Sequence, residues 1–162
     1  METQEKTLLD AIVTMLTETY AGPPDPSGTW FIDNEANSGV FGIIQGLSAE
    51  QASRSVNGTG EPGSTIAGNV EHLRWSLALA NAVLRGEDFS LNWKESWGVR
   101  STDQEGWERL QRTLREEYEA QRQALTNLTH LPEGDDLTGI LAMLPHGAFH
   151  LGLIRQMVER VR

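Results

Sequence analysis

The chain has 162 residues, no cysteine and a formal net charge of −10 at pH 7, from 23 acidic and 13 basic side chains. A chain of this length fits one domain, so residues 1–162 are expected to form a single domain with a full hydrophobic core. The missing cysteine excludes disulfide bonds, cysteine nucleophiles and cysteine-based zinc sites. The acidic balance disfavours nucleic acid as a partner, because its phosphates would be repelled.

The beginning of the sequence, METQEKTLLD, lacks the basic and apolar regions of a signal peptide. No run approaches the eighteen or so consecutive apolar residues of a membrane span. We therefore expect a cytoplasmic protein with neither nucleic acid nor a membrane as a partner. Any metal ion in it has to be held by histidines and carboxylates.

Two segments of the first half show helical periodicity, with apolar side chains three or four residues apart. The first covers residues 4–20 and the second covers residues 65–86, where Ser64 is the expected N-cap. Both are expected to be amphipathic helices. Their apolar stripes consist of Leu8, Ile12, Leu16 and Tyr20 in the first, and of Ile66, Val70, Leu73, Leu77 and Leu84 in the second.

The long connection between these helices contains two turn-rich segments, GPPDPSG and NGTGEPGS, and the short helical run LSAEQASRSV. Ser48 and Gln51 have the spacing of a capping box at the start of that run. Connections of this length are usually functional or disordered. The aromatic residues Trp30, Phe31 and Phe41 predict that this one packs against the helices.

Residues 103–128 show the clearest helical pattern, because charged side chains fall mostly off the apolar stripe. Ser101 and Gln104 resemble a capping box at its start. In the aromatic-rich connection before it, residues 87–102, Trp93 and Trp97 are expected to tie the chain to the helices. The stripe consists of Trp107, Leu110, Leu114, Tyr118, Leu125 and Leu128.

The last helical segment covers residues 136–160, with Asp135 or Asp136 available as a cap. Pro145 is expected to kink this helix or to restart it, because proline in a helix interior removes a backbone hydrogen bond and clashes with the preceding turn. Its apolar positions are Leu137, Ile140, Leu141, Leu144, Ile154, Met157 and Val158.

Four long helices, without a convincing alternating strand pattern, predict an all-α protein, specifically a four-helix bundle. Bundles of this kind build metal sites from side chains that project into the core from facing helices. The apolar stripes also permit a homodimer, and the sequence does not show which face would remain exposed.

Two of the four histidines, His146 and His150, are four residues apart in PHGAFHLGLIRQM. On a helix, side chains at this spacing lie about 40° apart around the axis and about 6 Å apart along it, so both can bind one ion. His72 falls near the middle of the second helix, where a bundle would bring it opposite the last one. Three imidazoles with one open position describe a catalytic or substrate-binding metal site.

Simpler interpretations remain open for each histidine. The pair fits equally well with two polar residues on a helix edge, and a single histidine in the position of His72 is more often packed in the core than a ligand. The fourth histidine, His130, follows the third helix and is expected to lie on the surface.

The segments TIAGNVEHLRWSL and HGAFHLGLIRQM together resemble the DinB-like (damage-inducible) family, as do GLSAEQAS, NWKESW and GWERLQRTL. The resemblance covers about residues 40–157 and implies a four-helix bundle of the DinB-like type. Its helices would run up-down-down-up, with a crossover between the second and third. It also implies a divalent metal ion, Zn²⁺ or Ni²⁺, held by His72, His146 and His150. Some members are isomerases or S-transferases that use a low-molecular-weight thiol.

One position departs from the family pattern. The family often reads H-x-G-Q-I after the histidine pair, and here Leu153 stands where the glutamine would be. A polar group one turn from His150 is therefore missing. This departure leaves the three ligands unchanged and concerns the reaction instead of the metal.

The sequence gives little indication of which residues could act as a general acid or a general base. Glu71 adjoins a ligand but points about 100° away around the helix. Arg74 and Arg155 could attract an acidic substrate, but pairing with surface carboxylates is the expected arrangement. Trp75 and Phe149 are expected to wall the pocket.

The leading hypothesis is a metal-dependent enzyme, specifically an S-transferase that joins a small thiol cosubstrate to an electrophilic small molecule. An ion with an open position can lower the pKa of a bound thiol toward neutrality, so the protein would need no cysteine of its own. The alternative is a noncatalytic, stress-linked bundle in which the metal is structural. In a third interpretation the bundle contains no metal and its histidines only pack.

Overall fold

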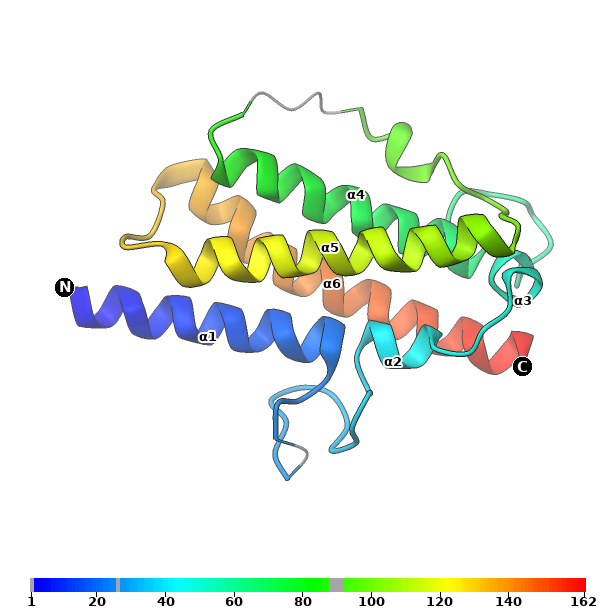
Figure 1. Ribbon diagram of the computed structural model, residues 1–162, viewed down its shortest axis with the longest axis horizontal. Helices are drawn as coiled ribbons and strands as arrows, with labels where there is room; N and C mark the ends of the chain where they lie inside the picture. Colours follow the sequence, from blue (N-terminus) through cyan, green and yellow to red (C-terminus); the bar gives the residue numbers. More distant parts are fainter. Residues whose placement is uncertain (1, 26, 88–91) are drawn as a thin grey trace.

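The computed structural model describes residues 2–25, 27–87 and 92–162, and every regular element in these ranges is a helix (Figure 1). The all-α prediction is therefore confirmed for the described part of the chain. Residues 88–91 of the aromatic-rich connection lie outside it. The long helices are α1 (Glu2–Ala21), α4 (Ile66–Leu84), α5 (Gln104–Asn127) and α6 (Gly134–Val161), and the short ones are α2 (Val40–Ile44), α3 (Ala49–Ser53) and the 3₁₀ helix η1 (Glu95–Trp97).

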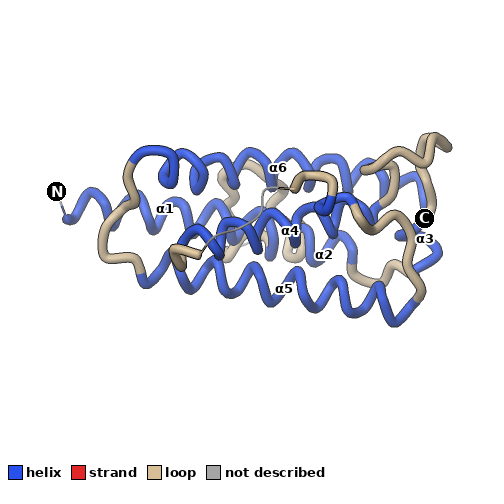
Figure 2. The backbone as a smooth tube through the Cα atoms, turned by 90° about the horizontal axis from the view of Figure 1, so that it is seen from above, coloured by secondary structure: helices blue, strands red, loops and turns tan. Residues whose placement is uncertain are grey.

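The four long helices lie side by side, as Figures 1 and 2 show from two directions. Both α1 and α4 contact α5 and α6. In Figure 1, α1 and α6 run in one direction, and α4 and α5 run in the opposite one. The chain therefore returns along the length of α4 before α5 begins, and η1 of this return segment packs against α4.

The core follows the predicted stripes with two corrections in α1 and α6. Leu8 is exposed and Leu9 is buried in its place. A step of four residues overshoots the helical repeat by about 40°, so a stripe extended only by fours drifts off the buried face, whereas Leu9, Ile12 and Leu16 alternate steps of three and four. Leu141 in α6 is likewise exposed, while Ile140 beside it is buried.

The first connection packs onto the helices differently from the prediction. Trp30 is 77% exposed and Phe31 is also exposed, so only Phe41, in α2, enters the core, where its ring lies near Tyr118. The loop is instead held through its backbone: the buried carboxylate of Glu18 accepts hydrogen bonds from the Trp30 amide at 3.0 Å and from the neighbouring Thr29 hydroxyl. A buried carboxylate needs such donors, and amides provide them without the indole ring.

The N-cap residue predicted from the sequence is confirmed for one helix, and for the others a different residue takes this position. Ser48 and Gln51 form the expected capping box at α3. At α4 the N-cap is Thr65 instead of Ser64, and at α5 it is Asp103 instead of Ser101. In both cases the residue immediately before the first helical turn accepts a hydrogen bond from the amide three residues later, as N-cap geometry requires.

Helix α6 begins at Gly134, and Asp135 and Asp136 lie in its first turn instead of capping it. The helix continues through Pro145 to Val161, so a restart at the proline was a wrong expectation. Among the described helices, α6 alone has the length and composition of a membrane span, with a mean hydropathy of 1.5 over an 18-residue window of which 28% is buried. Counting only consecutive apolar residues in the sequence had not predicted a segment with this mean hydropathy.

Candidate metal centre

The structure brings His72 of α4 together with His146 and His150 of α6. One ring nitrogen from each lies within 4.8 Å of the others. His72 and His150 are 5% and 4% exposed, and His146 is half-buried. The three histidines predicted from the sequence therefore form one cluster that could bind a metal ion.

Helix geometry accounts for this convergence. His146 and His150 lie on the same face of α6, one turn apart, with ring centroids separated by 4.7 Å. Because α6 packs against α4, this face meets the middle of α4, and the His72 ring centroid lies 5.0 Å from that of His146 and 4.8 Å from that of His150. Gly147 permits close packing at this point, since its Cα faces Thr19 and Tyr20 of α1.

Asn69, one turn before His72 on α4, fixes the protonation of His150. The Asn69 amide nitrogen donates to the backbone carbonyls of Gly63 and Thr65 at 2.8 and 2.9 Å. Carbonyls only accept, so the side-chain oxygen of Asn69 is the atom that faces His150 Nδ1, 2.9 Å away. His150 therefore carries its proton on Nδ1 and presents the Nε2 lone pair to the cluster.

Ser96 of η1 fixes His72 in the same way. The Ser96 hydroxyl lies 2.7 Å from the Trp93 carbonyl oxygen, to which it donates its single proton. The hydroxyl oxygen then accepts from His72 Nδ1 at 2.8 Å. His72 is thus also protonated on Nδ1, with the Nε2 lone pair free. Such hydrogen bonds from the second ring nitrogen are typical of metal-binding histidines.

His146 completes the cluster, with its Nε2 atom 3.0 Å from His72 Nε2. Without an ion, this nitrogen can donate a proton to the His72 lone pair. Two nitrogens bound to one tetrahedral zinc at about 2.0–2.1 Å would be separated by about 3.3 Å, close to the observed spacing. The three histidines could therefore bind a metal ion that accepts imidazole ligands.

Burial lowers the pKa of all three imidazoles, because desolvation disfavours the charged form. The pKa of His72 falls from 6.5 to about 4, and repulsion from His146 is the second cause. The pKa of His150 falls to about 3, with repulsion from both other histidines added to burial. At neutral pH all three rings are therefore neutral, which is the form that binds metal ions.

Tryptophans cover the outer side of His72. The Trp97 ring stacks on the His72 imidazole with centroids 4.0 Å apart and planes 9° from parallel. Gly63 makes room for that indole: it has a φ of +83°, and a Cβ atom there would lie 3.2 Å from the Trp97 ring. Trp93 contacts Trp75, which is buried. Phe149 is 63% exposed, and its edge-to-face contact with His150 connects it to the cluster.

The charged residues noted in the sequence are paired. Arg74 forms a two-bond ion pair with Glu71, its two contacts both 2.8 Å long. Arg155 pairs with Asp33 of the first connection. The expected pairing with carboxylates is therefore found for both arginines. The fourth histidine, His130, is exposed beside Glu5 of α1, away from the cluster, as predicted.

Sequence reasoning missed Asn69 and Ser96. Asn69 had a recognisable signal, because a residue three positions before a ligand lies on the same helical face. Ser96 had none, since it reaches His72 only through the path of the loop that contains η1.

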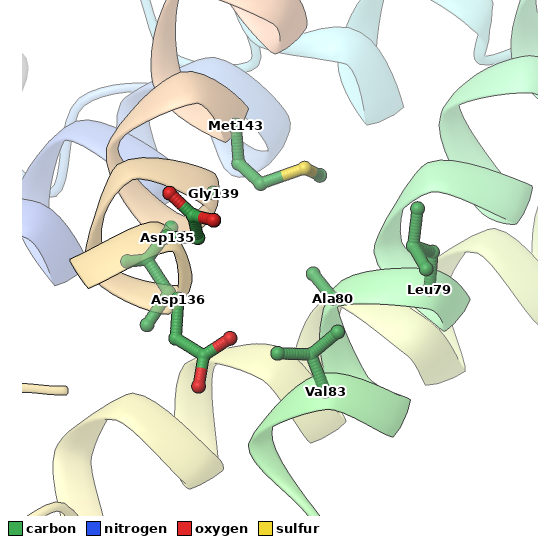
Figure 3. Close-up of a pocket in the computed structure, with 8 residues that line it drawn as sticks. Leu79, Ala80, Val83, Asp135, Asp136, Gly139 and Met143 are labelled. Atoms are coloured by element: carbon green, nitrogen blue, oxygen red, sulfur yellow. The ribbon is translucent and has the colours of Figure 1, made fainter. Parts of the chain in front are cut away.

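Two cavities border this region. One, of about 430 Å³, is lined by Pro62, Trp93, Lys94, Trp97 and Arg100. The other, of about 200 Å³, lies between α4 and α6 one to three turns from the histidines along these helices, where Leu79 and Val83 face Met143 (Figure 3). Its walls are apolar apart from Asp135 and Asp136 at the start of α6. The cluster is therefore flanked by a cavity with cationic residues and by one with acidic residues.

Comparison with known proteins gives no independent identification: no protein family, curated protein or solved structure matches this chain.

Proposed function

We propose that this chain is a DinB-like four-helix-bundle protein that binds one divalent metal ion through His72, His146 and His150, and that it is a low-molecular-weight-thiol S-transferase. The observation that carries the metal site is the fixed protonation of two of the histidines. Asn69 and Ser96 hold the protons of His150 and His72 on Nδ1, so that their Nε2 lone pairs face the cluster.

The arrangement of the long helices supports the family assignment. Their directions in Figure 1 follow the up-down-down-up order that the resemblance implies. One ligand comes from the second long helix and two come from the fourth, in keeping with the same resemblance. Neither feature follows from an all-α composition alone, since four helices can be connected in several orders.

Zn²⁺ and Ni²⁺ are the proposed ions. Neutral imidazole is a good ligand for both, and calcium or magnesium would call for oxygen ligands. The described residues of the cluster offer three nitrogens, and Leu153 adds no polar group. One position on the ion would remain for a substrate atom.

The chemistry would require little from ionisable side chains. A bound divalent ion lowers the pKa of a thiol held at its open position. In the transfer, the thiol sulfur forms a bond to an electrophilic carbon, the bond from that carbon to its leaving group breaks, and the thiol proton passes to solvent. The chain's own contribution is to hold three neutral imidazoles, exclude water from His72 and His150 by burial, and admit substrates past the tryptophans.

An activity screen tests this proposal. Untagged protein loaded with Zn²⁺ or Ni²⁺ is incubated with several small thiols and electrophiles, beside His150→Ala and the surface variant His130→Ala as a matched control. We expect turnover in the parent and in His130→Ala, and none above background in His150→Ala. Equal turnover in all three proteins would contradict a transferase at this site.

A noncatalytic role for the metal is the second candidate. It is favoured by the origin of the ligands on two helices, which an ion would link, and by the pairing of Glu71 with Arg74, which leaves no free base there. This role predicts that chelation strongly lowers the melting temperature and that thiols leave the visible spectrum of the Co²⁺-substituted protein unchanged. A transferase predicts that thiols alter that spectrum.

A further inference from the structure

The cavity beside His72 has the composition of a binding site for an anion. It measures about 430 Å³ and is lined by Pro62, Trp93, Lys94, Trp97 and Arg100. Two of its lining residues connect it to the histidine cluster: the Trp97 ring stacks on His72 with centroids 4.0 Å apart, and the Trp93 ring centroid lies 6.1 Å from that of His72. A molecule in this cavity would therefore contact the indoles that cover the candidate metal ligand.

Two cations, Lys94 and Arg100, line this cavity together, in a chain of net charge −10. Within the described part of the chain, neither Lys94 nor Arg100 takes part in an ion pair. Arg100 donates one hydrogen bond to the Gly60 carbonyl at 3.0 Å, and the nearby Glu95 carboxylate accepts from Asn92. Seven other cations have acidic partners, namely Lys6, Arg54, Arg74, Arg85, Arg109, Arg122 and Arg155, whereas Arg112, Arg115, Arg160 and Arg162 also form no ion pair with a described residue.

We propose that this cavity binds the oxyanion group, such as a carboxylate, of a small anionic cosubstrate whose other end reaches the histidine cluster. Lys94 and Arg100 would donate charge-assisted hydrogen bonds to the oxyanion, and the indoles of Trp93 and Trp97 would cover the apolar part of the molecule. This inference rests on the proposed function and specifies its cosubstrate as an anionic thiol. From the sequence, Arg74 and Arg155 could also have attracted an acidic substrate, but both are paired with carboxylates, as expected.

The charges of the second cavity, between α4 and α6, indicate how an anionic molecule would be oriented at the histidines. The walls of this cavity are apolar and its only charged lining residues are Asp135 and Asp136, so it would repel the same oxyanion. An anionic molecule placed at the histidines would therefore orient its charged end toward Lys94 and Arg100. Because both cations are exposed, their combined effect on affinity is expected to be about tenfold and to weaken as salt is added.

The first test needs no metal. Quenching of tryptophan fluorescence is titrated with 4-nitrobenzoate and with its neutral analogue 4-nitrobenzamide, at low and high salt. We expect the parent to bind the carboxylate about tenfold more tightly than the amide, a preference that Lys94→Gln/Arg100→Gln removes. The control Lys6→Gln/Arg122→Gln makes the same change in charge on α1 and α5 and should keep the preference. An equal preference in the parent and the Lys94 and Arg100 variant would overturn the anion site.

The second test connects the cavity to the metal. Co²⁺-substituted protein is titrated with ω-mercaptocarboxylates of increasing chain length and with the corresponding ω-mercaptoalcohols, and the change in the visible spectrum is recorded. We expect a carboxylate preference of about tenfold at one chain length, absent in the Lys94 and Arg100 variant. If no thiol changes the spectrum while the fluorescence preference holds, the thiol reaction is wrong and the anion site stands. If thiols change the spectrum without any carboxylate preference, the proposed function stands and this inference is overturned.

Discussion

The two sides of α4 show opposite ways of filling a protein interior. Toward α5, α4 packs in an apolar core that includes Leu114 of α5. Buried polar atoms of these two helices are incompletely paired: within the described residues, Gln121 Oε1 of α5 and Asn81 Oδ1 of α4 lack a hydrogen-bond partner. Toward α6, the buried polar side chains Asn69, His72 and His150 are all connected to one another or to η1.

This difference separates a surface that holds the fold together from one arranged for a ligand. Burying polar groups costs free energy unless they are hydrogen-bonded, and on the α6 side the rings of His72 and His150 meet this requirement through their Nδ1 atoms. The Nε2 atoms are left to face one another. Replacing α5 contacts should therefore change stability without changing metal binding, whereas replacing the partners of the histidines should do the reverse.

The largest effect on stability is expected on the α5 side. Leu114 is fully buried, so Leu114→Ala should lower the free energy of unfolding by about 2–5 kcal/mol through lost burial and a residual cavity. Urea denaturation measures this loss, and metal analysis of the folded variant should still give the parent's stoichiometry. A loss of metal in a variant that remains folded would contradict the division between the two sides.

Asn69→Ala should act mainly on the metal. It removes the acceptor for His150 Nδ1, and loss of such a partner lowers metal affinity by about 10–100-fold. Competition with a chromophoric chelator measures the affinity. Ser96→Ala should weaken binding similarly through His72, and unchanged affinity in both variants would show that the ring protons are not controlled by these residues.

Gly147→Ala should disturb the packing of α6 next to the ligands. A Cβ atom there would lie 2.9 Å from the Thr19 methyl group, and overpacking of this kind costs about 1–3 kcal/mol. The matched control is Gly152→Ala on the same helix, where no atom lies within 4 Å of the added carbon. The control should raise the melting temperature slightly, because alanine favours helix more than glycine does. Equal effects of the two substitutions would argue against close packing at Gly147.

The smallest effect is the pH dependence of the metal-free protein. Burial holds the pKa of His72 at about 4 and that of His150 at about 3, whereas in the unfolded chain both titrate near 6.5. The unfolded state therefore takes up protons first, so this contribution to stability is complete above about pH 6.5 and is lost as the pH falls toward 4. Between pH 7.5 and 6.0 the two histidines together lose about 1.5 kcal/mol of stabilisation, so we expect a decrease in melting temperature of roughly 3–6 °C.

A matched pair of variants isolates this pH effect. His150→Gln should reduce the decrease between the two pH values, and His130→Gln should leave it unchanged, because His130 lies on the surface. The same decrease in both variants would assign it to other groups.

The sequence predicted the long helices and the histidine pair of α6 well, because both depend on local spacing, and it placed His72 opposite that pair only through the expected packing of a bundle. Periodicity identified the four helices to within a few residues, and the i, i+4 spacing predicted that His146 and His150 share a face. It could not predict Ser96, whose position depends on how the loop before α5 folds back over α4. It also misjudged Trp30, because aromatic content does not reveal that Glu18 holds the loop through backbone amides.

The central claim is that three histidines from α4 and α6 bind one metal ion. The most direct test is the metal content of untagged protein purified without chelator, measured beside His72→Ala, His146→Ala and the control His130→Ala. The account predicts about one Zn²⁺ or Ni²⁺ per chain in the parent and in His130→Ala, and little in the other two. A folded parent that contains no metal and takes up neither added ion would contradict it.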